Sequence, residues 1–168
     1  MSYNLHENFL TLQELKLVTK KSEDIFNNPK ISYFTNHTSW NSNIVGDSNT
    51  VLIHHLSLQY EKEVFLLLKN KLIQKFNEAP KNIMFYYWLP GSYIPFHTDE
   101  HTHKACTLYL NEVWDLNWGG LYNCIVKNKI ETITPLYNLL VEQFDKMPHS
   151  VGPTRNSPPV RKTVQIFF

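Results

Sequence analysis

Residues 86–100 read "YYWLPGSYIPFHTDE", and this stretch is the most informative about the fold. An aromatic run comes first, a Pro-Gly turn follows, and a second short run leads to His97 and Asp99. Aromatic residues bounded by Gly and Pro are typical of short β-strands. The stretch therefore predicts a strand, a turn, and a second extended segment that carries a histidine and an aspartate at its end.

Similar short runs surround this stretch. Residues 50–56, 82–89, 104–111, 119–126, 129–134, 137–144 and 160–168 are rich in β-branched and aromatic residues. Two helices are predicted before most of them: residues 11–26 open with Thr11 and Glu14 at capping-box spacing, and residues 58–80 carry apolar residues at helical intervals up to Pro80. This order predicts an α+β, mainly β fold of roughly eight strands, in which the helices support one face of a jelly roll.

Length and composition predict one soluble domain. The chain of 168 residues is long enough for a real core, and we expect a single domain over 1–168, with helical and loop support in 1–80 and the catalytic core in about 81–168. Sixteen basic and fifteen acidic side chains give a net charge of +1, which gives no reason to expect nucleic acid as a partner. No signal peptide or membrane span is recognisable, and two cysteines without a CxxC pattern fit a reducing, cytoplasmic compartment.

His97 and Asp99 have the spacing of metal ligands. In a strand, residues i and i+2 point to the same side and lie roughly 6–7 Å apart, so both side chains can reach one ion. A third ligand is available in His149, which follows the predicted strand 137–144 and precedes a Gly-Pro turn. Two histidines and one carboxylate form the facial triad of non-haem Fe(II) oxygenases, which leaves metal positions open. The His-x-Asp pattern alone is common by chance.

Arg161 adds a second element that such chemistry needs. If 2-oxoglutarate chelates the metal, its far carboxylate requires a cation, and a guanidinium binds a carboxylate through two hydrogen bonds. Arg161 opens the last predicted strand, and alternation places it on the same face as Thr163, Gln165 and Phe167. Taken alone, Arg161 is better interpreted as part of a surface salt bridge.

The chain from about Tyr86 to Phe168 resembles the 2-oxoglutarate/Fe(II)-dependent dioxygenase superfamily, and within it the prolyl 4-hydroxylase-like branch. The matching pieces are "YYWLPGSYIPFHTDE" (86–100), "TLYLNEVWDLNWGGLY" (107–122) and "DKMPHSVGPTRNSPPVRKTVQIFF" (145–168), in family order. The resemblance implies a double-stranded β-helix in which His97, Asp99 and His149 bind Fe(II). It also implies 2-oxoglutarate and O₂ as co-substrates, and hydroxylation of a C–H bond, with a prolyl residue of a peptide or protein as the substrate.

The resemblance implies further co-substrate contacts. Arg161 corresponds to the residue that binds the far carboxylate of 2-oxoglutarate, and Tyr109 to a hydroxyl that reaches the same group. Tyr87 corresponds to another co-substrate-contacting tyrosine, with Tyr86 as the alternative if the register differs by one. Thr163 corresponds to an added hydroxyl in some relatives. Because the loop between His149 and the last strand is slightly long, Arg155 stays open as the carboxylate partner.

The residues leave other functions open. The same superfamily includes hydroxylases of free amino acids or other small molecules, and nucleic-acid demethylases. The demethylase interpretation needs two arginines on one strand, and Pro158 and Pro159 separate Arg155 from Arg161. A cupin-like binding protein is a further alternative, but all three triad residues are present, and His101-x-His103 is followed by no carboxylate until Glu112. A zinc hydrolase is another alternative, and it would not account for Arg161 and Tyr109.

The remaining polar candidates carry weaker expectations. Glu100, His101 and His103 are expected to face solvent or substrate rather than a metal. Cys106 and Cys124 fall within predicted strands and are expected to be small buried apolar residues. Substrate selection is expected in the N-terminal half and in the loops near Trp40 and Trp114.

Overall fold

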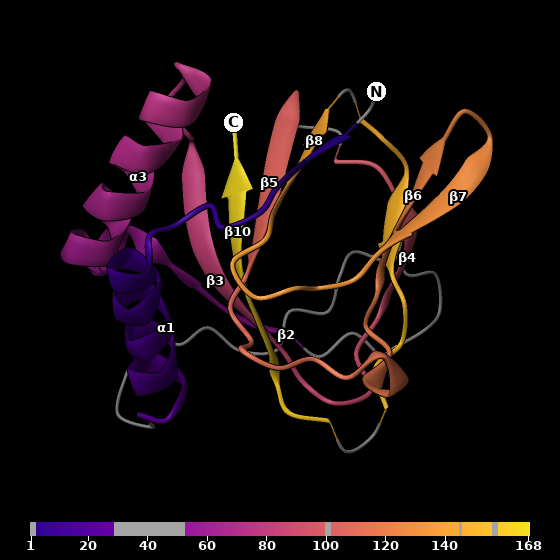
Figure 1. Ribbon diagram of the computed structural model, residues 1–168, viewed down its shortest axis with the longest axis horizontal. Helices are drawn as coiled ribbons and strands as arrows, with labels where there is room; N and C mark the ends of the chain where they lie inside the picture. Colours follow the sequence, from indigo (N-terminus) through magenta and orange to yellow (C-terminus); the bar gives the residue numbers. More distant parts are fainter. Residues whose placement is uncertain (1–2, 29–52, 100–101, 145, 156–157) are drawn as a thin grey trace.

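The computed structural model describes residues 3–28, 53–99, 102–144, 146–155 and 158–168, and within them the chain forms two facing β-sheets (Figure 1). The larger sheet has six strands in the order β1 (Tyr3–His6), β8 (Leu140–Phe144), β5 (Lys104–Tyr109), β10 (Arg161–Phe167), β3 (Asn82–Trp88) and β2 (Ile53–Ser57). The smaller sheet has four strands in the order β4 (Ile94–His97), β9 (His149–Val151), β6 (Tyr122–Val126) and β7 (Lys129–Ile133). The predicted mainly β jelly roll is confirmed.

Two N-terminal helices cover the outer face of the larger sheet, as predicted (Figure 1). The first, α1 (Leu12–Phe26), begins at the capping box that the sequence predicts. The Thr11 side chain accepts a hydrogen bond from the backbone N–H of Glu14, and the Glu14 carboxylate accepts one from the backbone N–H of Thr11. The second, α3 (Lys62–Phe76), follows a short 3₁₀ helix, η1 (Leu58–Tyr60).

The predicted end of the second helix is wrong. We expected Pro80 to close it, whereas Asn77 caps α3 in the left-handed conformation with φ 54°. Asparagine adopts that conformation more readily than most residues, so the helix ends before the proline can exclude it.

The main core lies between the helices and the larger sheet. Along β10, Val164 and Ile166 are buried in this core, whereas the alternate residues Arg161, Gln165 and Phe167 line a cavity between the sheets. Along β3, Phe85 and Tyr87 belong to the same core, and their neighbours Tyr86 and Trp88 face the cavity. Strand alternation therefore divides each central strand into a helix-facing set and a cavity-facing set.

Two strands were not anticipated. β1 is an edge strand of four residues that pairs with β8, and β9 has three residues beside β4 and β6. Both are too short to produce a recognisable pattern of alternation. β9 nevertheless has the greater bearing on the metal-ligand candidates, because it begins at His149.

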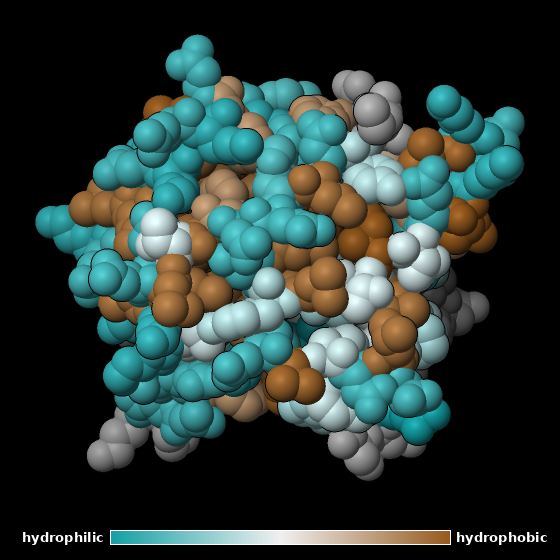
Figure 2. Space-filling model, viewed as in Figure 1, coloured by the Kyte–Doolittle hydropathy of each residue, from teal (hydrophilic) through white to brown (hydrophobic). Residues whose placement is uncertain are grey.

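The surface has no single dominant apolar face in the view of Figure 2, where hydrophilic and hydrophobic areas alternate. Exposed large apolar side chains are spread over separate elements, among them Leu12, Val113 and Ile130. Such scattered residues are normal on protein surfaces. Within the part of the chain that the structure describes, neither helix is both long and apolar enough to span a membrane.

Candidate active site

Three potential metal ligands meet between the two sheets. His97 ends β4, Asp99 follows it in the loop, and His149 begins β9. β4 and β9 are antiparallel, and their register places His97 directly opposite His149. One ligand atom from each of the three residues lies within 4.8 Å of the others. Strand pairing thus brings His149 to the His-x-Asp motif from a distant part of the sequence.

Both imidazoles are held with the same nitrogen toward the centre. His97 Nδ1 lies 2.9 Å from the Pro95 carbonyl, and His149 Nδ1 lies 2.9 Å from the Met147 carbonyl. A carbonyl can only accept, so each Nδ1 carries the proton and each Nε2 keeps the lone pair that a metal can use. Each Nε2 is 3.8 Å from one oxygen of Asp99. Fixing the tautomer through the second nitrogen is the usual support of a metal-binding histidine.

The electrostatics of this cluster suit a divalent cation. Burial lowers the pKa of His149, with a smaller opposing influence from Asp99 and a contribution in the same direction from His97. A lowered pKa favours the neutral imidazole, which is the form that ligates metals. In the form that ligates a metal, two imidazoles and one carboxylate together carry a negative charge that a cation would balance.

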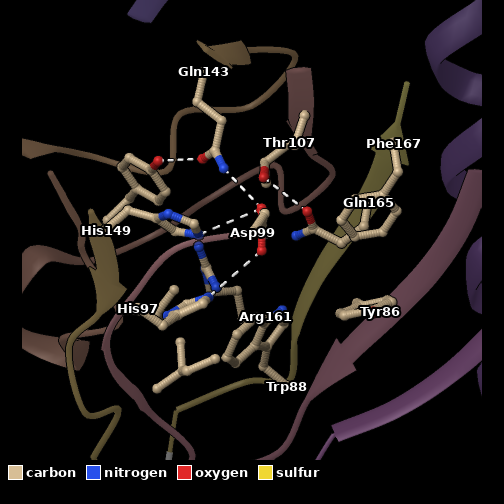
Figure 3. A pocket seen from close by; sticks show the side chains of 14 residues that line it. Tyr86, Trp88, His97, Asp99, Thr107, Gln143, His149, Arg161, Gln165 and Phe167 are labelled. Carbon is tan, nitrogen blue, oxygen red and sulfur yellow. Dashed lines mark hydrogen bonds and ion pairs between the residues drawn. The ribbon is translucent and has the colours of Figure 1, made fainter. Parts of the chain in front are cut away.

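A pocket opens beside the three ligands (Figure 3), and its empty space of about 470 Å³ includes the part that is open to solvent. Its walls combine apolar and neutral polar side chains from both sheets. The lining residues other than the three ligands are Tyr86, Trp88, Ile94, Ala105, Thr107, Tyr122, Gln143, Val151, Arg161, Gln165 and Phe167. Arg161 is the cationic residue in this described lining, so the cavity holds an acceptor cluster and a positive charge together.

Arg161 is buried without an anionic partner among the described residues. Its side chain is 1% exposed, and its guanidinium lies 5.0 Å from the centre of the Trp88 ring and 5.1 Å from that of Tyr109. Nε and Nη1 are buried and have no hydrogen-bond partner in the described part of the chain. A buried charge costs several kcal/mol unless it is paired. The two rings compensate only in part, so the guanidinium is suited to receive an anion.

Tyr109 and Thr163 lie beside Arg161. They face each other across the β5–β10 ladder, and both are buried. The Tyr109 hydroxyl has no well-formed hydrogen bond to a described residue. It interacts with the Arg161 guanidinium through charge and a side-chain hydrogen bond, which oppose the larger effect of burial in raising the pKa of Tyr109. Thr163 Oγ1 is 3.3 Å from Trp88 Nε1, which donates to it. The structure therefore brings both residues to the arginine, although the described cavity lining includes neither of them.

Tyr87 does not reach the cavity, and the structure corrects this expectation. Its hydroxyl donates to the Ser22 carbonyl at 2.9 Å, and its ring stacks on Phe26 of α1. Alternation along β3 turns it toward the helices, so the neighbouring Tyr86, the alternative register, lines the cavity instead. Burial raises the pKa of Tyr86 to about 12, so its hydroxyl stays protonated at neutral pH.

Arg155 is likewise not brought to the site. Its side chain is exposed. Its backbone N–H donates to the Trp118 carbonyl, and its carbonyl accepts from the Gly91 N–H. It lies outside β10, so it does not share a strand face with Arg161. Of the two candidate arginines, only Arg161 faces the cavity.

The Trp-Gly-Gly turn packs beside Arg161. Gly119 and Gly120 have φ of 74° and 65°, which is the left-handed region that favours glycine. A Cβ on Gly120 would lie 2.9 Å from Thr154 Cγ2, 3.2 Å from Trp114 Cζ2 and 3.5 Å from Arg161 Cδ. The turn is therefore part of the wall that confines the arginine stem.

The other sequence candidates lie away from the three ligands or outside the described residues. His103 is exposed, and its Nε2 lies 2.9 Å from Glu78 Oε1. Cys106 and Cys124 are free and buried within strands, as expected. The other three candidates, Trp40, Glu100 and His101, lie outside the described residues.

Two residues that the sequence analysis missed complete the surroundings of Asp99. Gln143 Nε2 donates to Asp99 Oδ2 at 2.8 Å, and the Tyr122 hydroxyl donates to Gln143 Oε1 (Figure 3). Alternation along residues 140–144 would have placed Gln143 on the inner face with Val141, because the two are separated by one residue. No sequence signal would have paired it with Tyr122, which comes from the other sheet.

The donor set fits a particular metal and ligand class. Two histidines and one carboxylate match non-haem Fe(II), since that metal keeps open positions with such a triad. Arg161 lines the cavity and has buried guanidinium nitrogens without a hydrogen-bond partner among the described residues, and these donors fit a carboxylate-bearing molecule in the same cavity. Tyr109 is buried beside Arg161. The residues present therefore fit both iron and a dicarboxylic co-substrate.

Comparison with known proteins supports the fold. No protein-family model matches the chain, and no curated protein matches it by sequence. Among solved structures, the chain resembles a Pseudomonas putida prolyl-4-hydroxylase with a TM-score of 0.74 and 15% identity, over 99% of this chain and 91% of that one. It also resembles a Trichoplax adhaerens prolyl hydroxylase in complex with a hypoxia-inducible factor peptide fragment, with a TM-score of 0.71 and 16% identity, over 99% and 83%.

A third similar structure has a different activity. It is the non-heme alpha-ketoglutarate-dependent epimerase of nogalamycin biosynthesis, with a TM-score of 0.69 and 11% identity, over 98% of this chain and 76% of that one. At these identities the similarity establishes the fold. The chain therefore has the fold shared by prolyl 4-hydroxylases and other 2-oxoglutarate/Fe(II) oxygenases.

Proposed function

We propose that this protein is an Fe(II)- and 2-oxoglutarate-dependent dioxygenase that hydroxylates a C–H bond, with a prolyl residue of a peptide or protein as its substrate. The observation that carries this proposal is the buried guanidinium of Arg161, which has no anionic partner in the described part of the chain and shares a cavity with His97, Asp99 and His149. A metal site that served only a structural role would use a closed set of four ligands and would not need this arginine.

Each group has a distinct task in this proposal. The two Nε2 atoms and the Asp99 carboxylate hold the metal, while Arg161 and the Tyr109 hydroxyl bind the far carboxylate of 2-oxoglutarate. When bound, iron, 2-oxoglutarate and O₂ supply the oxidising chemistry, in which the co-substrate becomes succinate and CO₂ and one oxygen atom enters the substrate. The protein binds and orients the reactants, and its apolar walls exclude water.

The choice of a prolyl substrate rests on two kinds of support. Two of the similar structures are prolyl hydroxylases, and one of them was solved with a peptide bound. The described cavity lining near the ligands is uncharged apart from Asp99 and Arg161, which suits a neutral ring such as that of proline. We also keep a cytoplasmic location as a prediction, supported by two free cysteines.

A small-molecule substrate is the second candidate. The similar epimerase acts in the biosynthesis of nogalamycin, so this fold also serves enzymes that do not modify peptides. The demethylase interpretation loses its main support, because Arg155 lies outside β10 and is exposed.

An anaerobic titration of the metal-free protein with Fe(II) and 2-oxoglutarate tests the proposal. We expect the visible absorption band of a 2-oxo acid chelated to Fe(II). His97→Ala should abolish this band, and Arg161→Ala should weaken it by raising the concentration of 2-oxoglutarate needed. Absence of the band in the wild type with iron bound would contradict the 2-oxoglutarate assignment.

The substrate class needs a second experiment. The loaded enzyme is exposed to air with proline-containing peptides or with free proline, and products are examined by mass spectrometry for one added oxygen atom. Oxidation of peptides alone would support the peptide assignment, whereas oxidation of free proline alone would favour the small-molecule candidate.

A further inference from the structure

A chain of two hydrogen bonds ends on the carboxylate of Asp99. Tyr122 lies in β6 of the smaller sheet and Gln143 in β8 of the larger sheet. The Tyr122 hydroxyl donates to Gln143 Oε1, and Gln143 Nε2 donates to Asp99 Oδ2 at 2.8 Å. The bonds therefore join both sheets to the loop that carries one of the three candidate ligands.

The chemistry of the three groups fixes the direction of these bonds. An ionised carboxylate can only accept, so the amide nitrogen of Gln143 must face Asp99, and its carbonyl must face Tyr122. The Tyr122 hydroxyl donates to that carbonyl, because an amide oxygen can only accept. The amide thus has one orientation available to it.

Tyr122 also contacts a second candidate ligand. Its ring stacks on the His149 imidazole, with centroids 5.5 Å apart and an angle of 22° between the planes. One tyrosine therefore touches His149 through its ring and influences Asp99 through its hydroxyl. Both Tyr122 and Gln143 are buried, 3% and 8% exposed, so water does not compete strongly for their hydrogen bonds.

We propose that Gln143 and Tyr122 are positioning residues that orient Asp99 for metal binding, with Gln143 acting directly on the carboxylate and Tyr122 acting through Gln143. The inference rests on the proposed metal site. Hydrogen-bond partners of a metal ligand restrict its rotation and tune its basicity. A carboxylate held in place in the metal-free protein loses less freedom when the metal binds.

Gln143 could instead be a residue that recognises substrate, since it lines the cavity. Its carbonyl and one of its N–H bonds are already engaged by protein groups, which favours the positioning role. The two roles differ in what they affect. A positioning residue changes the affinity for the metal alone, whereas a substrate contact changes only the KM for substrate.

The test measures Co(II) binding to the full chain without co-substrate, because the visible bands of Co(II) report its ligands directly and need no turnover. Gln143→Met keeps the length of the side chain and removes both hydrogen bonds, and we expect its Kd for Co(II) to rise by about 10–100-fold. Tyr122→Phe keeps the ring on His149 and removes only the hydroxyl, so we expect a smaller rise.

Matched controls use the same substitutions elsewhere. Gln165→Met changes another cavity glutamine, whose amide bonds go to Thr107 and Thr163 and not to a candidate ligand, and its Kd should equal that of the wild type. Tyr137→Phe removes a hydroxyl that lies 3.4 Å from Thr19 Oγ1 of α1, outside the cavity lining, and should also leave the Kd unchanged. Far-UV circular dichroism of each metal-free variant checks that it is folded.

A double variant separates positioning from general destabilisation. If Tyr122 acts through Gln143, Gln143→Met combined with Tyr122→Phe should bind Co(II) as weakly as Gln143→Met alone, because without the amide the hydroxyl no longer acts on Asp99. Wild-type affinity in Gln143→Met, or losses that add in the double variant, would overturn the inference. If Gln143→Met does not fold, wild-type affinity in folded Tyr122→Phe would overturn it. Failure of the wild type to bind any metal would instead overturn the proposed function.

Discussion

Replacing Arg161 by methionine should stabilise the metal-free protein and abolish its response to 2-oxoglutarate. The side chain is 1% exposed and has no anionic partner among the described residues. An unpaired buried charge costs several kcal/mol, whereas the cation–π contacts with two rings contribute only about 0.5–2 kcal/mol each. We expect Arg161→Met to raise the free energy of unfolding of the metal-free protein by about 1–3 kcal/mol, measured by urea denaturation.

The stabilisation that 2-oxoglutarate gives to the iron-bound protein should be lost in this variant. With Fe(II) bound under anaerobic conditions, 2-oxoglutarate at about 100 times its Kd should stabilise the wild type by about 2.7 kcal/mol. For a chain of this size, that is a rise of about 5–10 °C in Tm. Arg161→Met should show no such rise at the same concentration, because its methionine offers the far carboxylate neither charge nor hydrogen bonds.

Arg155→Met provides the matched control, since it makes the same substitution at an exposed arginine. Its stability should lie within about 0.5 kcal/mol of the wild type, and its response to 2-oxoglutarate should be intact. The reasoning is refuted if Arg161→Met destabilises the metal-free protein by more than about 1 kcal/mol, which is the size of one ordinary hydrogen bond. It is also refuted if 2-oxoglutarate stabilises Arg161→Met as much as the wild type.

The surroundings of the site support three other predictions. Gly120→Ala should cost about 1–3 kcal/mol in urea denaturation because its backbone is left-handed and the new Cβ would lie 2.9 Å from Thr154 Cγ2; an unchanged free energy of unfolding would contradict this. Tyr87→Phe should cost about 0.5–1.5 kcal/mol through the lost bond to Ser22 but leave 2-oxoglutarate binding unchanged, and a raised Kd would return Tyr87 to the site. The hydrogen bond from Lys104 lowers the pKa of Glu78 below 4.5, so its contribution to stability is present above that pH and is lost as the pH falls through the lowered value. Glu78→Gln should therefore flatten the acid-induced loss of stability below pH 4.5, and an unchanged slope would contradict the assignment.

The sequence identified the elements whose signals are local. The capping box of α1 depends on residues three apart, and the His-x-Asp motif spans three residues, so both could be read directly. Strand alternation also placed Arg161 on one face with Gln165 and Phe167, and the cavity lining follows it. These inferences need only the period of the strand or helix.

The features that were missed depend on register or on partners from distant strands. Tyr86 and Tyr87 are equally aromatic, and only the position of α1 shows which one faces the core. The end of α3 was set by the left-handed Asn77 rather than by the stronger signal of a proline. Gln143 meets Tyr122 across two sheets, a contact that no pattern along either strand encodes.

The order of strands in the larger sheet also constrains how the protein folds. β10 lies between β5 and β3 near the middle of that sheet, yet it leaves the ribosome after the other strands of both sheets, and β1 pairs with β8 from the far part of the chain. Contacts between such distant segments carry a large loop-closure entropy and slow the folding reaction. During synthesis, His97, Asp99 and His149 therefore leave the ribosome before Arg161. Until β10 inserts, strands β1, β8 and β5 of the larger sheet are not joined to β3 and β2.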